Sequence, residues 1–203
     1  MSKTAIILIG YQNDYFSKNG ILYSVIEESS VTSGVLENTI KVINSIKNEN
    51  VLIISTPIIF TSDYSELTEP VGILKTIKEV GAFKDGKFGS ETIDEIKEFK
   101  DRIIEVPGKL GLNAFMNTNL EEILKNNGIT HVALAGAVCS ICIDSTGRYA
   151  FEKGFEVSMI SDCISGRSVF EQQFYCENIF PLYASVLNSE SFIKKQASII
   201  NTQ

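Results

Sequence analysis

The sequence predicts an α/β fold: a three-layer, doubly wound, mostly parallel sheet of about six strands with helices on both faces. The first observation is a series of short continuous apolar runs, the pattern of strands that are buried on both faces. The second is that helical stretches long enough for crossovers separate these runs. Because no repeat, low-complexity run or linker divides the chain, residues 1–203 are expected to form one domain.

Strands and helices are predicted to alternate along the chain. The apolar runs predict strands at Ala5–Ile9, Val51–Ser55, Arg102–Val106, Val132–Ala135 and Val157–Ile160. Between them, helical spacing links Val35, Ile40, Ile43 and Ile46, and again Leu120, Ile123 and Leu124. This order predicts successive β-α-β units.

Two segments carry more specific local signals. Capping boxes at Thr92–Glu95 and Thr118–Glu121 predict helix starts, because a hydroxyl and a carboxylate can satisfy backbone donors reciprocally. Residues 62–87 fit neither period well and contain one proline and three glycines. They are therefore predicted to form a loop-rich excursion over one edge of the sheet.

Charge and hydropathy exclude two classes of partner. The chain has 25 acidic and 18 basic residues, a net charge of −7 and no basic stripe, so no nucleic acid is expected as a partner. The longest apolar stretch, Val51 to Phe60, contains polar residues and is far shorter than the ~20 residues of a membrane span. We expect no membrane partner. The N-terminus does not have the apolar region of a signal peptide, so a cytoplasmic location is expected.

The four cysteines are expected to be reduced thiols, because a chain of this size can bury a core without disulfides. Cys163 and Cys176 are predicted to be packing residues. Cys139 and Cys142 form a C-x-x-C sequence, which leaves a thiol redox role open as an alternative. A zinc site is not supported, since the only histidine, His131, precedes the fourth strand at the amino end of the sheet. We expect no cofactor and no metal.

The carboxyl ends of the predicted strands are where an open parallel sheet binds its ligand. Gly10–Asp14, Thr56–Pro57, Pro107–Lys109 and Gly136–Cys142 follow four of these strands and are expected to converge. Cys142 would open a helix, whose unpaired N–H groups favour a thiolate, and Lys109 could add a positive charge. Together they describe an activated nucleophile. The alternative is that Cys142 is a small buried helix residue and Lys109 a solvated loop charge.

Three segments resemble the isochorismatase-like cysteine hydrolases, a superfamily that includes nicotinamidases, ureidoacrylate and carbamoyl-amide hydrolases and isochorismatases. They are residues 7–16 (ILIGYQNDYF); Lys109 with 113–115 and 118–121; and 136–142 (GAVCSIC) with Thr146, Gly154 and Ser161-Asp162. The motifs stand in the family's order, each at a strand end, and the resemblance spans nearly the whole chain. It implies the same fold and the hydrolysis of a small amide or related carbon–nitrogen bond.

The resemblance also implies roles for individual residues. The family works through a Cys–Asp–Lys triad, which implies Cys142 as the nucleophile and Lys109 as the charge that holds its thiolate. Where the family has its acid/base aspartate, this sequence has Gly10. A cis peptide bond is implied between Ala137 and Val138, with the backbone N–H groups of Val138 and Cys142 forming an oxyanion hole.

Gly10 bears directly on activity, because glycine cannot transfer a proton and a well-placed acid or base contributes ~10²–10⁴ in rate. The candidates to replace it are a water, Tyr11, a carboxylate of the substrate, or Asp14, which corresponds to an acidic residue that is structural in the family. The isochorismatase reaction, which depends on the missing aspartate, is the least compatible one. The loop at residues 60–64 has no histidine, so the metal site of nicotinamidases is not expected.

The predicted function is a metal-free cysteine hydrolase of a small molecule, impaired or differently activated at position 10. A ligand-binding relative without catalysis is the alternative from another class. The pocket is predicted to be lined by aromatic side chains near the motifs: Tyr15, Phe16, Phe60, Phe83 and Phe115. Superfamily members commonly form dimers or tetramers, so the resemblance implies a homo-oligomer.

Overall fold

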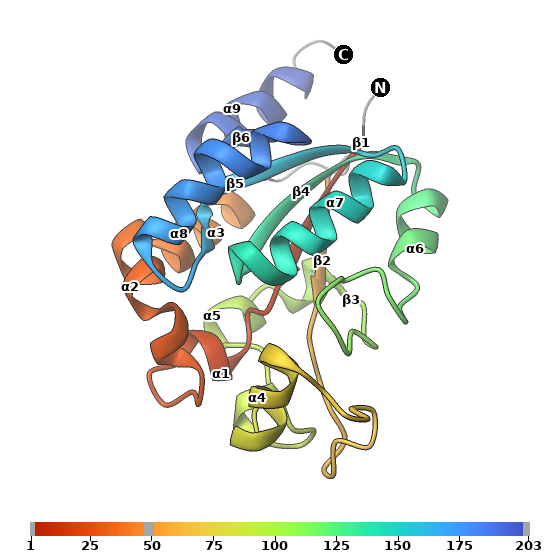
Figure 1. Ribbon diagram of the computed structural model, residues 1–203. Helices are drawn as coiled ribbons and strands as arrows, with labels where there is room; N and C mark the ends of the chain where they lie inside the picture. Colours follow the sequence, from red (N-terminus) through yellow and green to blue (C-terminus); the bar gives the residue numbers. More distant parts are fainter. Residues whose placement is uncertain (1–2, 47–50, 201–203) are drawn as a thin grey trace.

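A single parallel sheet of six strands forms the centre of the part of the chain that is described, residues 3–46 and 51–200 (Figure 1). The structure is a computed structural model. The strands lie in the order β3-β2-β1-β4-β5-β6. Their bounds are β1 (Lys3–Ile9), β2 (Val51–Thr56), β3 (Ile103–Glu105), β4 (Ile129–Ala137), β5 (Glu156–Ser165) and β6 (Ser185–Leu187). The numbering runs outward from β1 in both directions, which confirms the predicted doubly wound topology.

Helices cover both faces of the sheet, because both faces of its central strands are apolar. Ala5, Ile7 and Ile9 of β1 belong to one apolar cluster, and Ile6 and Leu8 belong to the other. The first cluster includes residues of α6 (Leu120–Asn126) and α7 (Asp144–Glu152). The second includes residues of α3 (Val35–Ser45), α5 (Asp94–Lys97) and α9 (Ser189–Ile200). These layers hold the carboxyl ends of β1 and β4 at the middle of the sheet.

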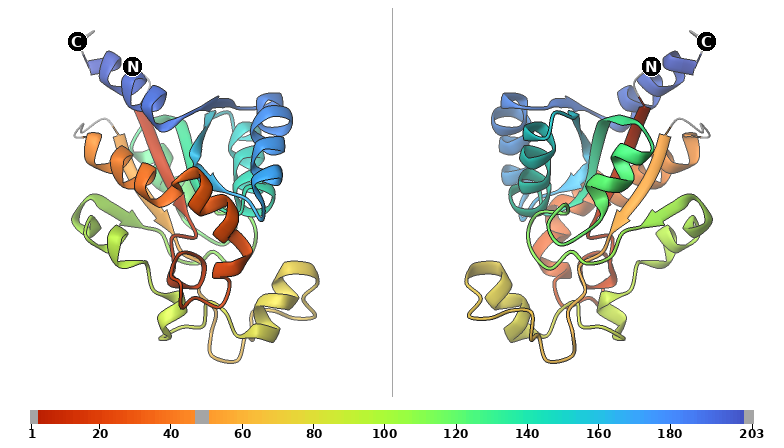
Figure 2. Two further views of the ribbon diagram at one scale, coloured as in Figure 1. Left: turned by 90° about the vertical axis from the view of Figure 1, so that its left-hand side faces the viewer. Right: turned by 90° about the vertical axis from the view of Figure 1, so that its right-hand side faces the viewer.

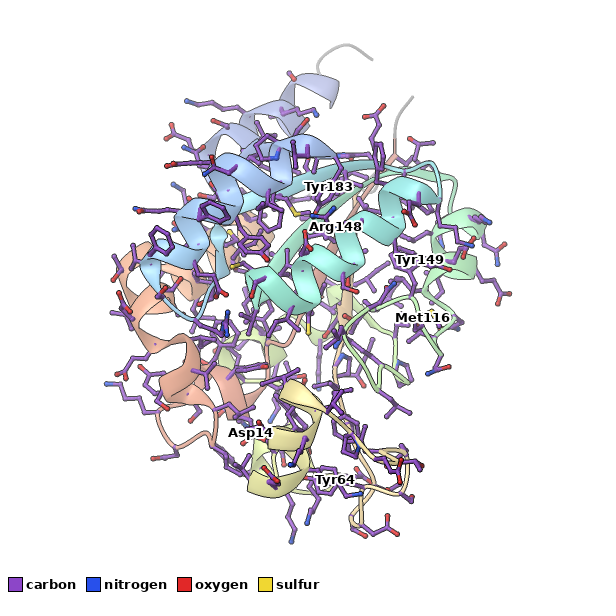
Figure 3. The ribbon with its side chains drawn as sticks, viewed as in Figure 1. Asp14, Tyr64, Met116, Arg148, Tyr149 and Tyr183 are labelled. Atoms are coloured by element: carbon purple, nitrogen blue, oxygen red, sulfur yellow. The ribbon has the colours of Figure 1, made fainter. Side chains whose placement is uncertain are left out.

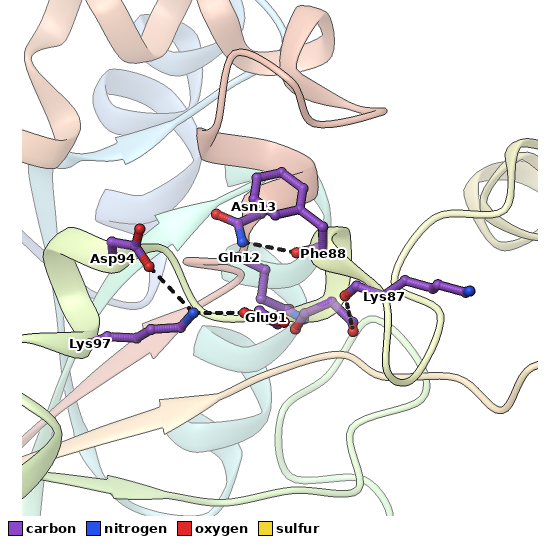
Figure 4. Close-up of polar contacts among 8 residues, drawn as sticks. Gln12, Asn13, Lys87, Phe88, Glu91, Asp94 and Lys97 are labelled. Carbon is purple, nitrogen blue, oxygen red and sulfur yellow. Dashed lines mark hydrogen bonds and ion pairs between the residues drawn. The ribbon is translucent and has the colours of Figure 1, made fainter.

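Shorter elements complete the fold. The loop after β1 contains α1 (Asn13–Phe16) and leads to α2 (Tyr23–Ser33), and α8 (Val169–Phe174) follows β5. Short 3-10 turns lie at Phe88–Ser90, Lys100–Arg102 and Phe180–Leu182, and π-helical turns at Cys139–Ile143 and Tyr175–Ile179. Figure 4 shows how the first of these 3-10 turns is tied to α1, through a hydrogen bond from Asn13 to the carbonyl oxygen of Phe88.

The segment predicted as a loop-rich excursion contains a helix, α4 (Gly72–Val80), so that prediction is corrected. Ile73, Leu74 and Ile77 have helical spacing and pack in a third apolar cluster, away from the two sheet faces. Gly81 ends the helix in the left-handed conformation, at φ +78°, as a glycine C-cap does. Figure 2 shows α4 beyond the carboxyl end of β1, apart from the helices that cover the sheet.

Two helix starts also differ from the sequence prediction. Thr92 and Thr118 do not act as N-caps, because α5 begins at Asp94 and α6 at Leu120, with no side-chain cap on either. The Thr118 hydroxyl accepts a hydrogen bond from the Leu120 N–H instead. The Glu121 carboxylate forms ion pairs with Lys125 and Lys153, so it is not free to complete a capping box.

Candidate active site

A small pocket lies where the ends of β1, β2 and β4 meet the segment that follows β3. Its free volume is about 10 Å³, close to the space that one water needs. Its walls combine the predicted catalytic positions with aliphatic side chains, and the lining residues are Ile9, Gly10, Tyr15, Thr56, Ile58, Ile73, Leu74, Ile77, Lys109, Gly111, Leu112, Ala137, Ile141 and Cys142. The strand ends therefore converge on a narrow pocket, and a ligand larger than a water would need its walls to move apart.

Lys109 and Cys142 face each other in this pocket. The Lys109 ammonium nitrogen lies 3.5 Å from Sγ of Cys142 and also donates a hydrogen bond to the carbonyl oxygen of Gly111. Only 2% of the Lys109 side chain is exposed, so the ammonium is not a solvated loop charge. A buried cation beside a thiol stabilises negative charge on the sulfur, and the thiolate is the nucleophilic form.

The backbone at the end of β4 presents Cys142 to the pocket. Gly136 has a φ of +125°, and a Cβ there would stand 1.9 Å from the Ile9 carbonyl oxygen, so only glycine allows the ends of β1 and β4 to lie this close. The peptide bond between Ala137 and Val138 is cis. Cys142 was expected to open a helix, but it lies within the π-helical turn Cys139–Ile143 that precedes α7. Its sulfur therefore faces the pocket from this π-helical turn.

Gly10 forms part of the pocket wall directly after β1. Its φ is +73°, and a Cβ there would lie 3.2 Å from the Ala137 carbonyl oxygen and 3.3 Å from Cδ2 of Tyr15. No carboxylate stands among the described residues that line the pocket. Position 10 therefore presents no acidic group to the pocket, and the edge of the Tyr15 ring lies next to it.

The structure places the two side-chain candidates for a replacement acid outside the pocket lining. The Tyr11 hydroxyl is hydrogen-bonded to the Thr39 hydroxyl and to the carbonyl oxygen of Cys163, within the second apolar cluster. The Asp14 carboxylate accepts hydrogen bonds from the N–H groups of Ile21 at 3.2 Å and Phe83 at 2.6 Å. Asp14, labelled in Figure 3, is buried near α4 and joins the loops on either side of the third apolar cluster. Neither group is positioned to exchange a proton at Cys142.

Of the five aromatic residues predicted to line the pocket, Tyr15 is among the lining residues. Phe60 and Phe83 are fully buried in the third apolar cluster, and Phe16 stacks on Tyr11 with ring centroids 4.8 Å apart. Phe115 packs against Tyr149 in the cluster beneath α7. Aliphatic residues of α4 line the pocket instead, and their helical spacing in the sequence was the available signal.

The remaining cysteines are held in different surroundings from Cys142. Cys139 is fully buried against Gly166, and its pKa is raised by burial and then by the nearby Glu171. Burial also raises the pKa of Cys163 to about 12 and that of Cys176 to about 11. Cys139 contacts the start of the segment after β5, whereas Cys142 contacts Lys109. The two thiols of the C-x-x-C sequence therefore have different neighbours.

His131 lies in β4, at the opposite end of the sheet from the pocket. Its Nδ1 is 3.0 Å from the Thr4 hydroxyl, and its Nε2 is 2.8 Å from the Ser158 hydroxyl. Burial and then Lys195 lower its pKa to about 4, against a smaller opposite effect of Glu156. Within residues 3–46 and 51–200, no group of three His, Cys, Asp or Glu side chains is placed to hold a metal ion. None of the helices described there is long and apolar enough to cross a membrane.

Two named relatives and one crystal structure are similar to this chain. Ureidoacrylate amidohydrolase RutB of Variovorax paradoxus (strain S110) is 25% identical over 211 residues, which cover 97% of this chain and 82% of the relative. Nicotinamidase 3 of Arabidopsis thaliana is 29% identical over 134 residues, covering 66% of this chain and 65% of the relative. The crystal structure of a cysteine hydrolase from Pseudomonas syringae pv. phaseolicola 1448A superposes with a TM-score of 0.85 at 18% identity, covering 97% of this chain and 93% of that one.

The match to a protein family is equally extensive. Residues 4–191 match the isochorismatase domain, a span that includes Gly10, Lys109 and Cys142 and all of the six strands except the first residue of β1. The chain therefore belongs to the isochorismatase family.

Proposed function

We propose that this protein hydrolyses a carbon–nitrogen bond of a small amide through an acyl intermediate on Cys142. The observation that carries the proposal is the Lys109 ammonium, buried in the pocket wall 3.5 Å from Sγ of Cys142. The relatives named ureidoacrylate amidohydrolase and nicotinamidase support an amide as the substrate. The reaction requires no cofactor or metal in this proposal.

In this mechanism Cys142 attacks the carbonyl carbon as a thiolate, and Lys109 stabilises that thiolate before attack and after its release. The backbone N–H groups of Val138 and Cys142 are the proposed donors to the oxyanion of the tetrahedral intermediate. Both residues lie at the turn after β4, where the cis peptide bond between Ala137 and Val138 redirects the chain.

The chemistry of the pocket wall favours an uncharged acyl group. Apart from Lys109, the described lining residues carry no basic side chain and no carboxylate. Half of the described lining residues are isoleucine or leucine, three of them from α4. A charged acyl group would lose its hydration there without gaining a partner, since the Lys109 ammonium already faces the Cys142 sulfur and the Gly111 carbonyl oxygen.

The test is ammonia release from a panel of small primary amides, ureides and carbamoyl compounds, with Cys142→Ala as the matched variant. We expect turnover of at least one uncharged compound, complete loss in Cys142→Ala, and a covalent adduct on the peptide that contains Cys142 when an activated ester is used. Turnover that survives Cys142→Ala would overturn the proposal.

A ligand-binding protein without turnover is the second candidate, and the absence of a carboxylate from the described pocket lining favours it. Comparison of the unchanged protein with Gly10→Asp in the same assay separates the two. If only Gly10→Asp releases ammonia, this chain is a binding protein on a hydrolase scaffold. If the unchanged chain releases ammonia, another group supplies the proton.

A further inference from the structure

The cleavage of an amide requires that a proton reach the leaving nitrogen, because an amide anion is too basic to depart. The described lining of the pocket contains no carboxylate and no imidazole. Apart from Cys142, its side chains with a dissociable proton are Lys109, Thr56 and Tyr15. The identity of the proton donor therefore depends on which of these three is available.

Two of these three groups already have hydrogen-bond partners. The Thr56 hydroxyl is fully buried and directed at the Leu8 carbonyl oxygen. The Lys109 ammonium donates to the Gly111 carbonyl oxygen and faces the Cys142 sulfur. If Lys109 gave up a proton, it would lose the positive charge that stabilises the Cys142 thiolate when that thiolate is released at the end of the reaction. Tyr15 remains.

We propose that Tyr15 is the catalytic acid that protonates the leaving nitrogen, an assignment that rests on the proposed hydrolysis through Cys142. Its ring lies in the same pocket wall as Cys142 and Lys109. Atoms Cδ2 and Cε2 lie 3.3 and 3.5 Å from the point where a Cβ on Gly10 would stand, so one edge of the Tyr15 ring lies beside the position that the glycine leaves without a side chain.

The surroundings of Tyr15 suit a proton donor. Only 4% of Tyr15 is exposed. Among the described residues, its hydroxyl has no hydrogen-bond partner. The ring packs against Phe83 with centroids 5.1 Å apart, which holds its orientation. Burial, and then the charges of Cys142 and Asp14, raise the pKa of Tyr15, so the phenol keeps its proton at neutral pH until a basic nitrogen forms beside it.

The proton balance closes over one turnover. The Cys142 thiolate adds to the carbonyl carbon, forming the C–S bond and an oxyanion. When the oxyanion collapses, the C–N bond breaks and the nitrogen takes the Tyr15 proton, leaving ammonia, the thioester and a phenolate. Water then adds to the thioester carbonyl and gives its proton to the phenolate. The C–S bond breaks, which releases the carboxylic acid and restores the thiolate opposite Lys109.

The experiment compares Tyr15→Phe with the unchanged protein on two substrates that share one acyl group, a primary amide and a p-nitrophenyl ester. Nitrophenolate leaves without a proton, so the acid is needed only for the amide. We expect amide turnover to fall roughly 10²–10³-fold and the rate of the nitrophenolate burst to stay within about threefold.

Tyr64→Phe is the matched control. Tyr64 belongs to the same apolar cluster, but its hydroxyl donates to the Ala82 carbonyl oxygen at 2.7 Å and it is not among the residues that line the pocket. We expect its amide turnover to stay within about twofold of the unchanged protein. Thermal unfolding of Tyr15→Phe checks that the retained ring keeps the fold.

The outcomes separate this assignment from the proposed function. Equal losses for amide and ester in Tyr15→Phe, or no loss for the amide, would show that Tyr15 is not the acid while leaving Cys142 as the nucleophile. An ester burst without amide turnover in the unchanged protein would do the same. The absence of any Cys142-dependent burst would overturn both proposals.

Discussion

The side-chain amide of Gln12 forms a pair of hydrogen bonds with the backbone of Ile58. Its Nε2 donates to the Ile58 carbonyl oxygen at 2.9 Å, and its Oε1 accepts from the Ile58 N–H at 2.9 Å. Nε2 also donates to the Ser90 carbonyl oxygen at 2.7 Å. Ile58 in turn forms a parallel β-bridge with Lys109. One buried amide thus joins the loop after β1 to the segment that carries the proposed catalytic lysine.

Gln12→Leu is expected to lower the free energy of unfolding by roughly 3–6 kcal/mol. Three buried backbone groups would lose their partner, and each unsatisfied group costs ~1–3 kcal/mol. Urea unfolding followed by circular dichroism measures the change. The control is Gln173→Leu on the exposed surface, which should stay within about 0.5 kcal/mol of the unchanged protein. Equal effects of the two variants would show that the Gln12 amide does not hold the site together.

Cys142 should be the first thiol to react with a small alkylating agent. Burial raises the pKa of Cys139, Cys163 and Cys176, so few of these thiols are ionised at pH 7. Iodoacetamide followed by peptide mass spectrometry at pH 7 should place the modification on Cys142 at least about tenfold faster than on any other cysteine. Faster modification of Cys176, the most exposed of the other three thiols, would contradict this order.

Lys109→Met should slow the alkylation of Cys142 at pH 7 by about tenfold, because the thiolate loses the ammonium 3.5 Å away. Lys125→Met is the control, since Lys125 pairs with Glu121 on the surface of α6. It should leave the rate of Cys142 alkylation unchanged, and equal slowing in the two variants would mean that the charge beside Cys142 is not the cause.

Gly10→Ala should destabilise the protein by about 2 kcal/mol, from the positive φ and from the close Ala137 oxygen and Tyr15 ring. Gly128→Ala is a matched control, because Gly128 has a φ of +67° with no atom within 4 Å of its Cβ position. It should cost about 1 kcal/mol from backbone conformation alone. If Gly10→Ala costs no more than Gly128→Ala, the pocket has room for a side chain at position 10.

His131 should remain neutral down to about pH 4, because burial and Lys195 lower its pKa. The unfolded chain takes up the proton near pH 6.5, so the stabilisation from the neutral imidazole is complete above that pH. It is lost as the pH falls from 6.5 to about 4, by on the order of 3 kcal/mol. Since the sequence has one histidine, a single imidazole NMR resonance reports the titration directly. A midpoint near pH 6.5 in the folded protein would contradict the prediction.

The central strands could be predicted because continuous apolar runs leave few alternatives. β1 and β4 lie at the middle of the sheet, and both faces of each are covered by helices. Lys109 follows β3 and Cys142 follows β4 at the same edge of the sheet, so their convergence could be predicted. Sequence position alone left their direct contact open, because a buried cysteine and a solvated lysine fitted it as well. Edge strand β6 (Ser185–Leu187) was not predicted, because its three half-exposed residues form no apolar run.

The pocket walls could not be predicted to the same extent. Gly72 and Gly81 resemble loop signals in the sequence, but they stand at the two ends of α4, where glycine marks a helix boundary. Once this helix was missed, its isoleucine and leucine side chains could not be placed, and nearby aromatic residues were assigned to the pocket in their stead. Buried phenylalanines and pocket phenylalanines look alike in sequence, since both lie in apolar surroundings.

The position of helix α4 bears on how the selectivity of this protein can evolve. It contributes Ile73, Leu74 and Ile77 to the pocket, while Gly10, Lys109 and Cys142 come from segments at the strand ends. In the proposed function, the residues that select the substrate and the residues that react with it therefore lie in separate stretches of the chain. Exchange of residues at three positions of one peripheral helix offers a route to new selectivity, in nature or in the laboratory, that leaves the reacting groups where they are.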